Sequence, residues 1–236
     1  MSAPLLQVAA LGHSFGGLRA VNDVSFDLGP GEVVALMGPN GAGKTTLLNL
    51  ISGQRQPDSG RVLFADQDVT EASPSSPARK GMLRSYQNGG IFAKLTATEN
   101  VAVPLLARGI PLGQARERSR DVLVQLGLAP VLDDRAELLS GGQRKLIDFA
   151  RCVANRVRLV LLDEPTNGVH PHLGETMAAQ IGRMRDEGTA FLIVSHDLPW
   201  AFSICTRAVM MAAGEVLVAG RPADVAADSR VHEAYL

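Results

Sequence analysis

The chain lacks the features that mark membrane-spanning, secreted and nucleic-acid-binding proteins. No apolar run in its 236 residues approaches the roughly 20 residues that a membrane-spanning helix needs. The stretch MSAPLLQVAALGHSFGG has no basic segment followed by an apolar one, so we expect no secretory signal. The 23 lysines and arginines are balanced by 24 aspartates and glutamates, which speaks against a nucleic-acid partner. These absences predict a cytoplasmic protein.

Cysteine and aromatic residues are scarce as well. Cys152 and Cys205 lie far apart in the sequence and have no metal-ligand spacing, which predicts reduced thiols in or near the core. Aromatic residues make up 4% of the chain, so its apolar content of 46% is mostly aliphatic. At this length such a chain can bury the core of one large domain or two small ones.

Three continuous apolar runs of strand length occur at Glu32–Gly38, Arg158–Glu164 and Thr189–His196. Continuous rather than alternating apolar character predicts strands that are covered on both faces, as in a parallel sheet. A helical stretch, Pro171–Glu187, separates the last two runs and ends before Gly188. This order of strand, helix and strand predicts an α/β fold built from βαβ units.

The remaining segments predict two further parts. Short, alternating, turn-bounded segments near the N-terminus indicate a small antiparallel sheet, and Ala208–Pro222 indicates a strand pair that turns at Ala213 and Gly214. Residues 97–155 have helical periodicity and indicate an inserted helical subdomain. We therefore predict one domain over 1–236, with an α/β core and antiparallel sheet from 1–86 and 157–236 and a helical subdomain from 87–156.

The stretch GPNGAGKTTLLNLISG begins at Gly38 and places several glycines directly before a predicted helix. Gly38, Gly43, Lys44 and Thr45 fit the pattern G-x-x-x-x-G-K-[ST], which binds phosphates when it follows a strand and opens a helix. Glycines let backbone N–H groups converge on phosphate oxygens, and the helix adds its positive end. An ordinary glycine-rich turn with a solvated lysine is the alternative. The pattern predicts a nucleoside-triphosphate-binding protein.

A pair of carboxylates, Asp163 and Glu164, follows the apolar run LVLL. Ligands of parallel α/β sheets bind at the carboxyl ends of strands, so Asp163 is placed to hold Mg²⁺ and Glu164 to act as a general base. Two solvated acids at a strand end are the alternative. Farther upstream, Ser140 begins the amphipathic segment SGGQRKLIDFAR. Serine is a good helix N-cap, so a simple capped helix explains this segment equally well.

Five ordered motifs resemble those of the ATP-binding subunits of ABC transporters. GPNGAGKTT resembles the Walker A motif, SYQ (Ser85–Gln87) the Q-loop, LSGGQ the signature motif, LVLLDEP the Walker B motif and VSHD (Val194–Asp197) the switch-histidine segment. Their order and spacing match the family over essentially the whole chain. This resemblance implies a P-loop NTPase core with an antiparallel subdomain and a helical subdomain, and ATP and Mg²⁺ as ligands.

The resemblance also implies a role for individual residues. Glu164 would be the general base, His196 would position it, and Gln87 would sense the γ-phosphate. The Mg²⁺ ligands would be Thr45, Gln87 and Asp163. ATP would be bound by Phe15, stacked on the adenine, and by Gly38, Pro39, Asn40, Gly41, Ala42, Gly43, Lys44, Thr45 and Thr46. The nucleotide of a second subunit would be bound by Ser140, Gly141, Gly142 and Gln143. The alternatives are a core phenylalanine at 15, a polar loop residue at 87 and a structural histidine at 196.

The implied partners are a second ATP-binding subunit, identical or different, and transmembrane permease subunits that dock on the segment after Gln87. The chain would lie on the cytoplasmic face of the inner membrane. Phe15–Phe26 and the ending VHEAYL resemble the ATPases of branched-chain amino acid importers, which also work with a solute-binding protein. Urea and amide importers look alike here, and a lipid or lipopolysaccharide exporter ATPase is the alternative. His170 stands where many relatives have aspartate.

Overall fold

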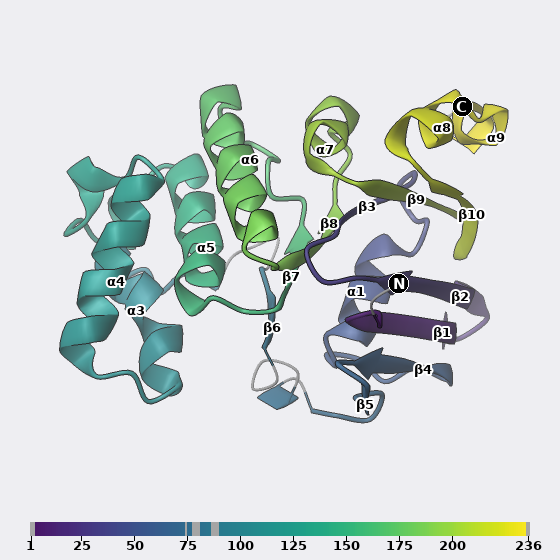
Figure 1. The fold of residues 1–236 in the computed structure, drawn as a ribbon, viewed down its shortest axis with the longest axis horizontal. Helices are drawn as coiled ribbons and strands as arrows, with labels where there is room; N and C mark the ends of the chain where they lie inside the picture. Colours follow the sequence, from purple (N-terminus) through teal and green to yellow (C-terminus); the bar gives the residue numbers. More distant parts are fainter. Residues whose placement is uncertain (1–2, 74, 77–80, 86–89, 235–236) are drawn as a thin grey trace.

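The computed structural model describes residues 3–73, 75–76, 81–85 and 90–234, which form two sheets and a set of helices (Figure 1). The strands of the larger sheet are, in spatial order, β10 (Glu215–Gly220), β9 (Arg207–Ala212), β3 (Val33–Met37), β8 (Ala190–Val194), β7 (Leu159–Asp163) and β6 (Met82–Arg84). β10 is antiparallel to β9, and the other neighbours are parallel. The three apolar runs form β3, β7 and β8, which confirms the predicted parallel sheet.

The smaller sheet is antiparallel and comes from the first 68 residues of the chain. Its strands are, in order, β2 (Leu18–Leu28), β1 (Leu6–Phe15), β4 (Ser59–Phe64) and β5 (Gln67–Asp68). Ala213 and Gly214, both at positive φ, form the turn between β9 and β10. The predicted N-terminal sheet and C-terminal strand pair are therefore confirmed.

The helices surround the larger sheet and also build one end of the molecule. They are α1 (Lys44–Ile51), α3 (Ala97–Ala107), α4 (Leu112–Gln125), α5 (Gly141–Asn155), α6 (Pro171–Asp186), α7 (Leu198–Ile204), α8 (Pro222–Ala227) and α9 (Ser229–Ala234), with the 3₁₀ turns η1 (Ala129–Val131) and η2 (Ala136–Leu138). α3, α4 and α5 pack together beyond β6 and β7 (Figure 1). The proposed subdomain boundaries stay a prediction, because 86–89 lie outside the described residues.

Capping boxes begin two of these helices. Thr96 accepts a hydrogen bond from the backbone N–H of Glu99 while the Glu99 carboxylate accepts one from the N–H of Thr96, and Ser140 and Gln143 form the same pair at the start of α5. Such reciprocal bonds satisfy amides that a helix start otherwise leaves unpaired. The sequence SGGQ thus fixes where α5 begins, as predicted.

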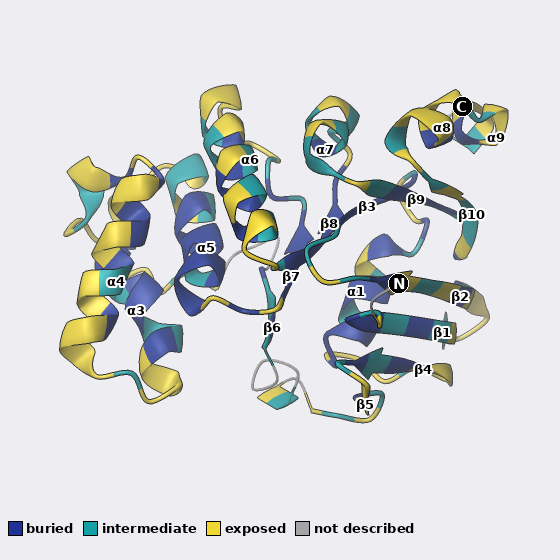
Figure 2. Cartoon of the chain, in the orientation of Figure 1, coloured by how far each residue is buried: buried dark blue, intermediate teal, exposed yellow. Residues whose placement is uncertain are grey.

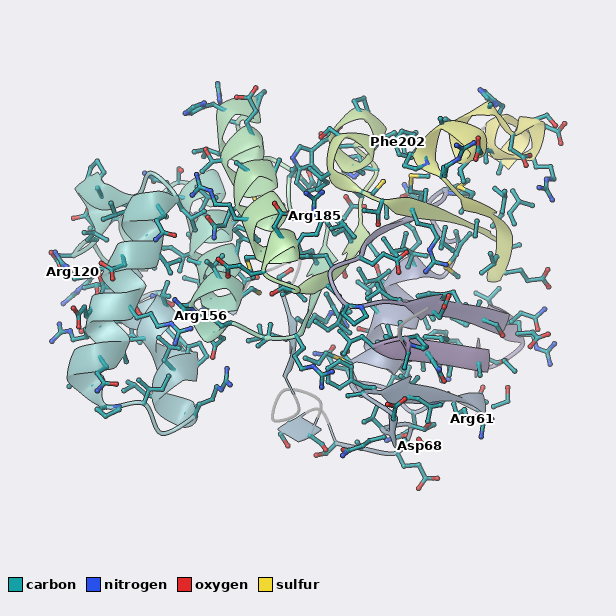
Figure 3. All side chains as sticks on the ribbon, in the orientation of Figure 1. Arg61, Asp68, Arg120, Arg156, Arg185 and Phe202 are labelled. Atoms are coloured by element: carbon teal, nitrogen blue, oxygen red, sulfur yellow. The ribbon has the colours of Figure 1, made fainter. Side chains whose placement is uncertain are left out.

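The core lies on both faces of the larger sheet (Figure 2). Along β7, Leu159 and Leu161 pack with α1 and the smaller sheet, whereas Val160 and Leu162 pack with α5 and α6. This alternation follows from the two-residue period of a strand. Charged side chains such as Arg61 and Arg120 project outward at opposite ends of the molecule (Figure 3). Because both faces of the larger sheet are covered, its central strands are buried along their length.

The loop between β3 and α1 fits tightly between neighbouring backbones. A Cβ atom on Gly38 would lie 2.1 Å from the carbonyl oxygen of Met211 in β9, and one on Gly43 would lie 2.1 Å from that of Ala20 in β2. Both glycines have positive φ, 146° and 96° respectively. The glycines therefore let the loop lie directly against both sheets, in addition to allowing its curvature.

We predict that Gly43→Ala destabilises the protein more than Gly41→Ala. Gly41 has a similar positive φ of 82°, but a Cβ atom added to it would meet no atom within 4 Å. The Gly41 variant should lose about 1–2 kcal/mol, the cost of the left-handed conformation. The Gly43 variant should lose at least about 3 kcal/mol, because the clash with Ala20 adds to that cost. Urea-induced unfolding would measure both values, and equal losses would contradict the close packing of the loop.

Candidate functional site

The carboxyl ends of four neighbouring strands carry most of the predicted site residues. β3 leads into Gly38 and α1, β8 ends two residues before His196, β7 ends at Asp163, and β6 ends at Arg84. Because these strands are parallel neighbours, their carboxyl ends meet at one edge of the sheet. The fold therefore brings the Walker A, Walker B and switch-histidine segments together. Gln87 lies outside the described residues.

The phosphate loop, residues 38–45, opens α1 without a side-chain cap. Gly43 stands at the N-cap with φ 96° and offers no side-chain acceptor to the first turn. Side chains do cap α3, α5, α6 and α7. The first amides of any helix lack intrahelical partners, so those of α1 remain available to another acceptor. An anion with several oxygens is the acceptor that such a helix start favours.

Lys44 is buried and turned back over the phosphate loop. Its ammonium donates hydrogen bonds to the carbonyl oxygens of Gly38, at 2.7 Å, and Pro39, at 2.9 Å. Burial lowers the pKa of Lys44, while the nearby carboxylates of Glu164 and Asp163 oppose that shift. An ammonium group has three protons, so one is left to donate toward a ligand. The lysine is thus held in the loop with its charge beside both acids.

Asp163 is 4% exposed and has one paired and one unpaired carboxylate oxygen. Oδ2 accepts a hydrogen bond from Arg84 at 3.1 Å, whereas Oδ1 is buried without a hydrogen-bond partner among the described residues. Burial raises the pKa of this carboxyl, and the charge and hydrogen bond of Arg84 oppose the rise. A buried, unpaired oxygen is costly unless it has a ligand. Asp163 therefore fits a site for a hard cation.

The other oxygen donors nearby also fit Mg²⁺. Thr45, the first residue after Lys44 in α1, is exposed and has a hydroxyl to offer. No group of three histidine, cysteine, aspartate or glutamate side chains with metal-binding geometry occurs in the part of the chain that the structure describes. Magnesium is usually held by one or two protein oxygens together with phosphates, so a full protein cage is not needed.

Glu164 and His196 are in direct side-chain contact. The Nδ1 atom of His196 lies 2.6 Å from Oε2 of Glu164, and the backbone N–H of His196 donates to the same oxygen at 3.2 Å. Glu164 has a left-handed backbone with φ 50°, which costs a non-glycine residue about 1–2 kcal/mol. Strain of this kind is found at functional sites.

The signature segment, residues 139–143, lies on the other side of the strands from α1. α5 begins at this segment, and β6 and β7 separate α5 from α1 (Figure 1). Ser140 and Gly141 are exposed, and Gly142 packs against Val169 and Leu173. The structure therefore does not bring the signature segment to the phosphate loop of its own chain.

The loop that follows β7 contacts the start of α5. The ammonium of Lys145 donates hydrogen bonds to the backbone oxygens of Glu164 and Asn167. His170 accepts a hydrogen bond from the N–H of His172 and thereby caps α6. A histidine can thus perform the capping role that an aspartate would have at this position.

Phe15 is exposed at the end of β1, contrary to the alternative of a core phenylalanine. The residue is 43% exposed, and its ring meets that of His13 edge to face with 4.9 Å between ring centroids. The guanidinium of Arg55 lies 4.6 Å from the ring centroid of Phe15. An exposed aromatic ring of this kind can stack on a base.

Sequence analysis missed three residues that the structure adds to the site: Arg84, Lys145 and Arg55. The sequence signal for Arg84 is its position, directly after a short apolar run and three residues before Gln87. Lys145 lies two residues after the LSGGQ motif and looked like an ordinary helix-surface charge. Nothing in the sequence pairs Arg55 with Phe15, because the two residues lie in separate segments that only the tertiary fold brings together.

Comparisons with known proteins agree with this geometry. The family model described as ABC transporter matches residues 21–167. The lipopolysaccharide export system ATP-binding protein LptB of Acidithiobacillus ferridurans is 34% identical, covering 98% of this chain and 96% of its own. The high-affinity branched-chain amino acid transport ATP-binding protein BraF of Pseudomonas aeruginosa is 32% identical, covering 100% and 99%.

Solved structures give the same result. A nucleotide-free ATP-binding cassette from an ABC transporter superposes with a TM-score of 0.90 at 28% identity, covering 99% of both chains. A dimeric cassette bound to ADP and phosphate superposes with a TM-score of 0.84 at 25% identity, covering 92% of this chain and 98% of that one. Within the described ranges, no helix has the length and apolar character needed to cross a membrane. The chain therefore belongs to the ABC transporter family, as an ATP-binding cassette that hydrolyses ATP to power transport.

Proposed function

We propose that this chain binds Mg-ATP between its phosphate loop and the signature segment of a second ATPase subunit, and that hydrolysis there powers an importer. The proposed solute is a branched-chain amino acid or a related amide or urea compound. The observation that carries the hydrolytic part is the contact of Glu164 with His196 beside the buried charge of Lys44. This contact places a carboxylate base and a group that positions it at the same edge of the sheet as the phosphate loop.

Phosphate binding rests on the helix start and on Lys44. The amides of the first turn of α1 and the third proton of the Lys44 ammonium donate to phosphate oxygens. The carbonyls of Gly38 and Pro39 hold that ammonium in place, so little side-chain freedom is lost on binding. Phe15 stacks on the adenine, an interaction worth about 1–3 kcal/mol in other base-binding proteins. Asn40, Gly41, Ala42 and Thr46 complete the loop around the phosphates.

Thr45 and Asp163 hold Mg²⁺ in this proposal, with Gln87 as a further predicted ligand. The metal supplies charge stabilisation to the phosphate oxygens. Oδ1 of Asp163 has no hydrogen-bond partner in the described structure and is the protein oxygen offered to the cation. The exposed hydroxyl of Thr45 extends from the helix that also carries Lys44. Both donors are hard oxygens, which magnesium prefers.

Glu164 takes the proton of the attacking water. Its Oε2 is occupied by the Nδ1 atom and the backbone N–H of His196, so Oε1 is left for the water. His196 thus fixes the orientation of the base, and when both of its ring nitrogens carry protons, the second one donates to the γ-phosphate. The side chain of Glu164 is 13% exposed and that of His196 is 60% exposed, so the histidine is the group that a second subunit can cover.

Two subunits complete the site. The signature residues lie away from their own phosphate loop; Ser140 and Gly141 are exposed, whereas Gly142 and Gln143 are half-buried. A head-to-tail pair places this segment on the nucleotide of the partner. Two such composite sites follow from two-fold symmetry. The dimeric cassette of similar fold, bound to ADP and phosphate, supports this arrangement. The second subunit is either another copy of this chain or a different ATPase.

The permease and the direction of transport rest on similarity to named relatives. BraF aligns over the whole chain and supports an importer of branched-chain amino acids. Permease subunits and a solute-binding protein are the partners that we propose for it. LptB, at 34% identity, favours lipopolysaccharide export as the second candidate. Phe92 and Leu138 are 49% and 76% exposed and offer apolar surface for a permease segment on the cytoplasmic face of the membrane. Reconstituted transport distinguishes these candidates.

We predict that Glu164→Gln lowers ATP turnover by at least about 100-fold while nucleotide affinity stays within about threefold, because only the base is lost. Steady-state phosphate release and fluorescent-nucleotide titration measure the two effects. Glu117→Gln, on the exposed surface of α4, is the matched control and should retain full turnover. Turnover near the unmodified rate in the Glu164 variant would remove Glu164 as the base.

We predict that ATP doubles the solution mass of the Glu164→Gln protein and that adding Ser140→Arg abolishes this pairing. The arginine would fill the space that the partner's phosphates need. Thr96→Arg removes the same kind of capping box from α3 and controls for helix destabilisation. Light scattering with and without ATP measures the mass. Pairing that survives Ser140→Arg contradicts the role of the signature segment, whereas ATP binding without pairing assigns the second position to a different subunit.

We predict that proteoliposomes containing this subunit and importer-type permease subunits take up leucine or urea when ATP and the solute-binding protein are supplied. Uptake should stop with Lys44→Ala, because the buried charge beside the phosphates is lost. The rate of accumulation of radiolabelled solute measures transport. Lipopolysaccharide extraction by a complex with exporter-type membrane subunits, without solute uptake, would instead establish the second candidate.

A further inference from the structure

Arg84 connects two elements of the candidate site and is not one of the residues predicted from sequence. Its side chain is 6% exposed, and that of Asp163 is 2% exposed. One guanidinium nitrogen, Nη1, donates to Oδ1 of Asn49 at 2.6 Å and to Oγ of Ser52 at 3.1 Å. The other, Nη2, donates to Oδ2 of Asp163 at 3.1 Å. Arg84 therefore joins α1 to the end of β7.

The rigid guanidinium fixes which oxygen of Asp163 remains open. Its two terminal nitrogens lie in one plane at a fixed angle, so bonds to α1 restrict the position of the nitrogen that binds Asp163. With Oδ2 engaged, Oδ1 is left buried and without a hydrogen-bond partner in the described ranges. The N–H of Asp163 is also directed to the hydroxyl of Ser85, the residue after Arg84. The end of β6 thus orients both the backbone and the side chain of Asp163.

Arg207 also bridges two elements of the fold, but it lies away from the candidate site and serves as a comparison for Arg84. Arg207 in β9 pairs with Glu32 at 2.8 Å and with Asp27 at 3.3 Å. Those carboxylates lie at the opposite ends of the strands from the phosphate loop and are 23% and 62% exposed. Arg84 differs because its carboxylate partner is buried, has one unpaired oxygen and lies beside Lys44 and Glu164.

We propose that Arg84 is a positioning residue for the magnesium site. By binding Oδ2 of Asp163 it presents Oδ1 to the cation, and by binding Asn49 and Ser52 it fixes this oxygen relative to the helix that carries Thr45. The inference rests on the proposed function, in which Thr45 and Asp163 hold the metal. It adds a residue that touches neither metal nor nucleotide yet sets the distance between the two protein ligands.

The test is the Mg²⁺ dependence of nucleotide binding, measured with a fluorescent, non-hydrolysable ATP analogue. Affinity is determined in EDTA and then as a function of Mg²⁺ concentration. Arg84→Gln should raise the half-saturating Mg²⁺ concentration about tenfold or more, because one charge-assisted contact to the metal ligand is lost. Its affinity in EDTA should stay within about twofold, because binding by the phosphate loop is unchanged. Electron paramagnetic resonance of Mn²⁺ should show weaker metal binding in the same variant.

Three further variants make the outcome decisive. Arg84→Lys keeps the positive charge but lacks the planar guanidinium with its two terminal nitrogens. Its half-saturating Mg²⁺ concentration should therefore lie between those of the unmodified protein and Arg84→Gln. This milder variant also serves if Arg84→Gln fails to fold. Arg207→Gln should lose thermal stability without changing the Mg²⁺ dependence. Asp163→Asn should abolish most of that dependence.

An unchanged half-saturating Mg²⁺ concentration in both Arg84 variants, with stability lost as in Arg207→Gln, would overturn the proposal and leave Arg84 a structural link. Tighter Mg²⁺ binding in Arg84→Gln would also overturn it, because Arg84 would then compete with the metal for Asp163. If Asp163→Asn retains the full Mg²⁺ dependence, Asp163 is not a metal ligand. That result contradicts the proposed function and is distinguishable from a failure of the Arg84 proposal alone.

Discussion

The start of α1 is the physical constraint on which the rest of the site depends. Its first amides have no side-chain cap, and Gly38 and Gly43 press the loop before it against Met211 and Ala20 of the two sheets. The loop is thus held from both sides, and the uncapped amides at the start of α1 can donate to an anion without reorganising. Every other group of the site is placed relative to this fixed helix end.

Two buried charges secure that placement from either side. Lys44 is held by loop carbonyls, and Arg84 is held between α1 and Asp163. Burial disfavours the charged forms of Lys44 and Asp163, and their mutual attraction opposes that effect. The buried charges of Lys44 and Asp163 are of opposite sign and therefore stabilise one another. Such an arrangement suits a ligand that is itself highly charged and brings a cation with it.

Much of the fold could be predicted because local patterns and tertiary structure agree. The continuous apolar runs became buried parallel strands, and Ser140 became the N-cap of α5, as its residue type favours. The pairing of Arg84 with Asp163 could not be predicted, since it joins residues 79 positions apart in the chain. Such a contact depends on the order β8-β7-β6, which periodicity alone does not determine.

In the proposed pair, Lys145 would connect the two parts that one chain contributes to the composite sites. It lies in the first turns of α5, close to the signature segment, and binds the backbone oxygens of Glu164 and Asn167. The residue that carries the base is therefore tied to the helix that would contact the partner's nucleotide. In the proposed pair, a shift of α5 on closure would act on the backbone of Glu164 through these bonds. This link gives a physical reason why hydrolysis in one site would depend on the occupancy of the other.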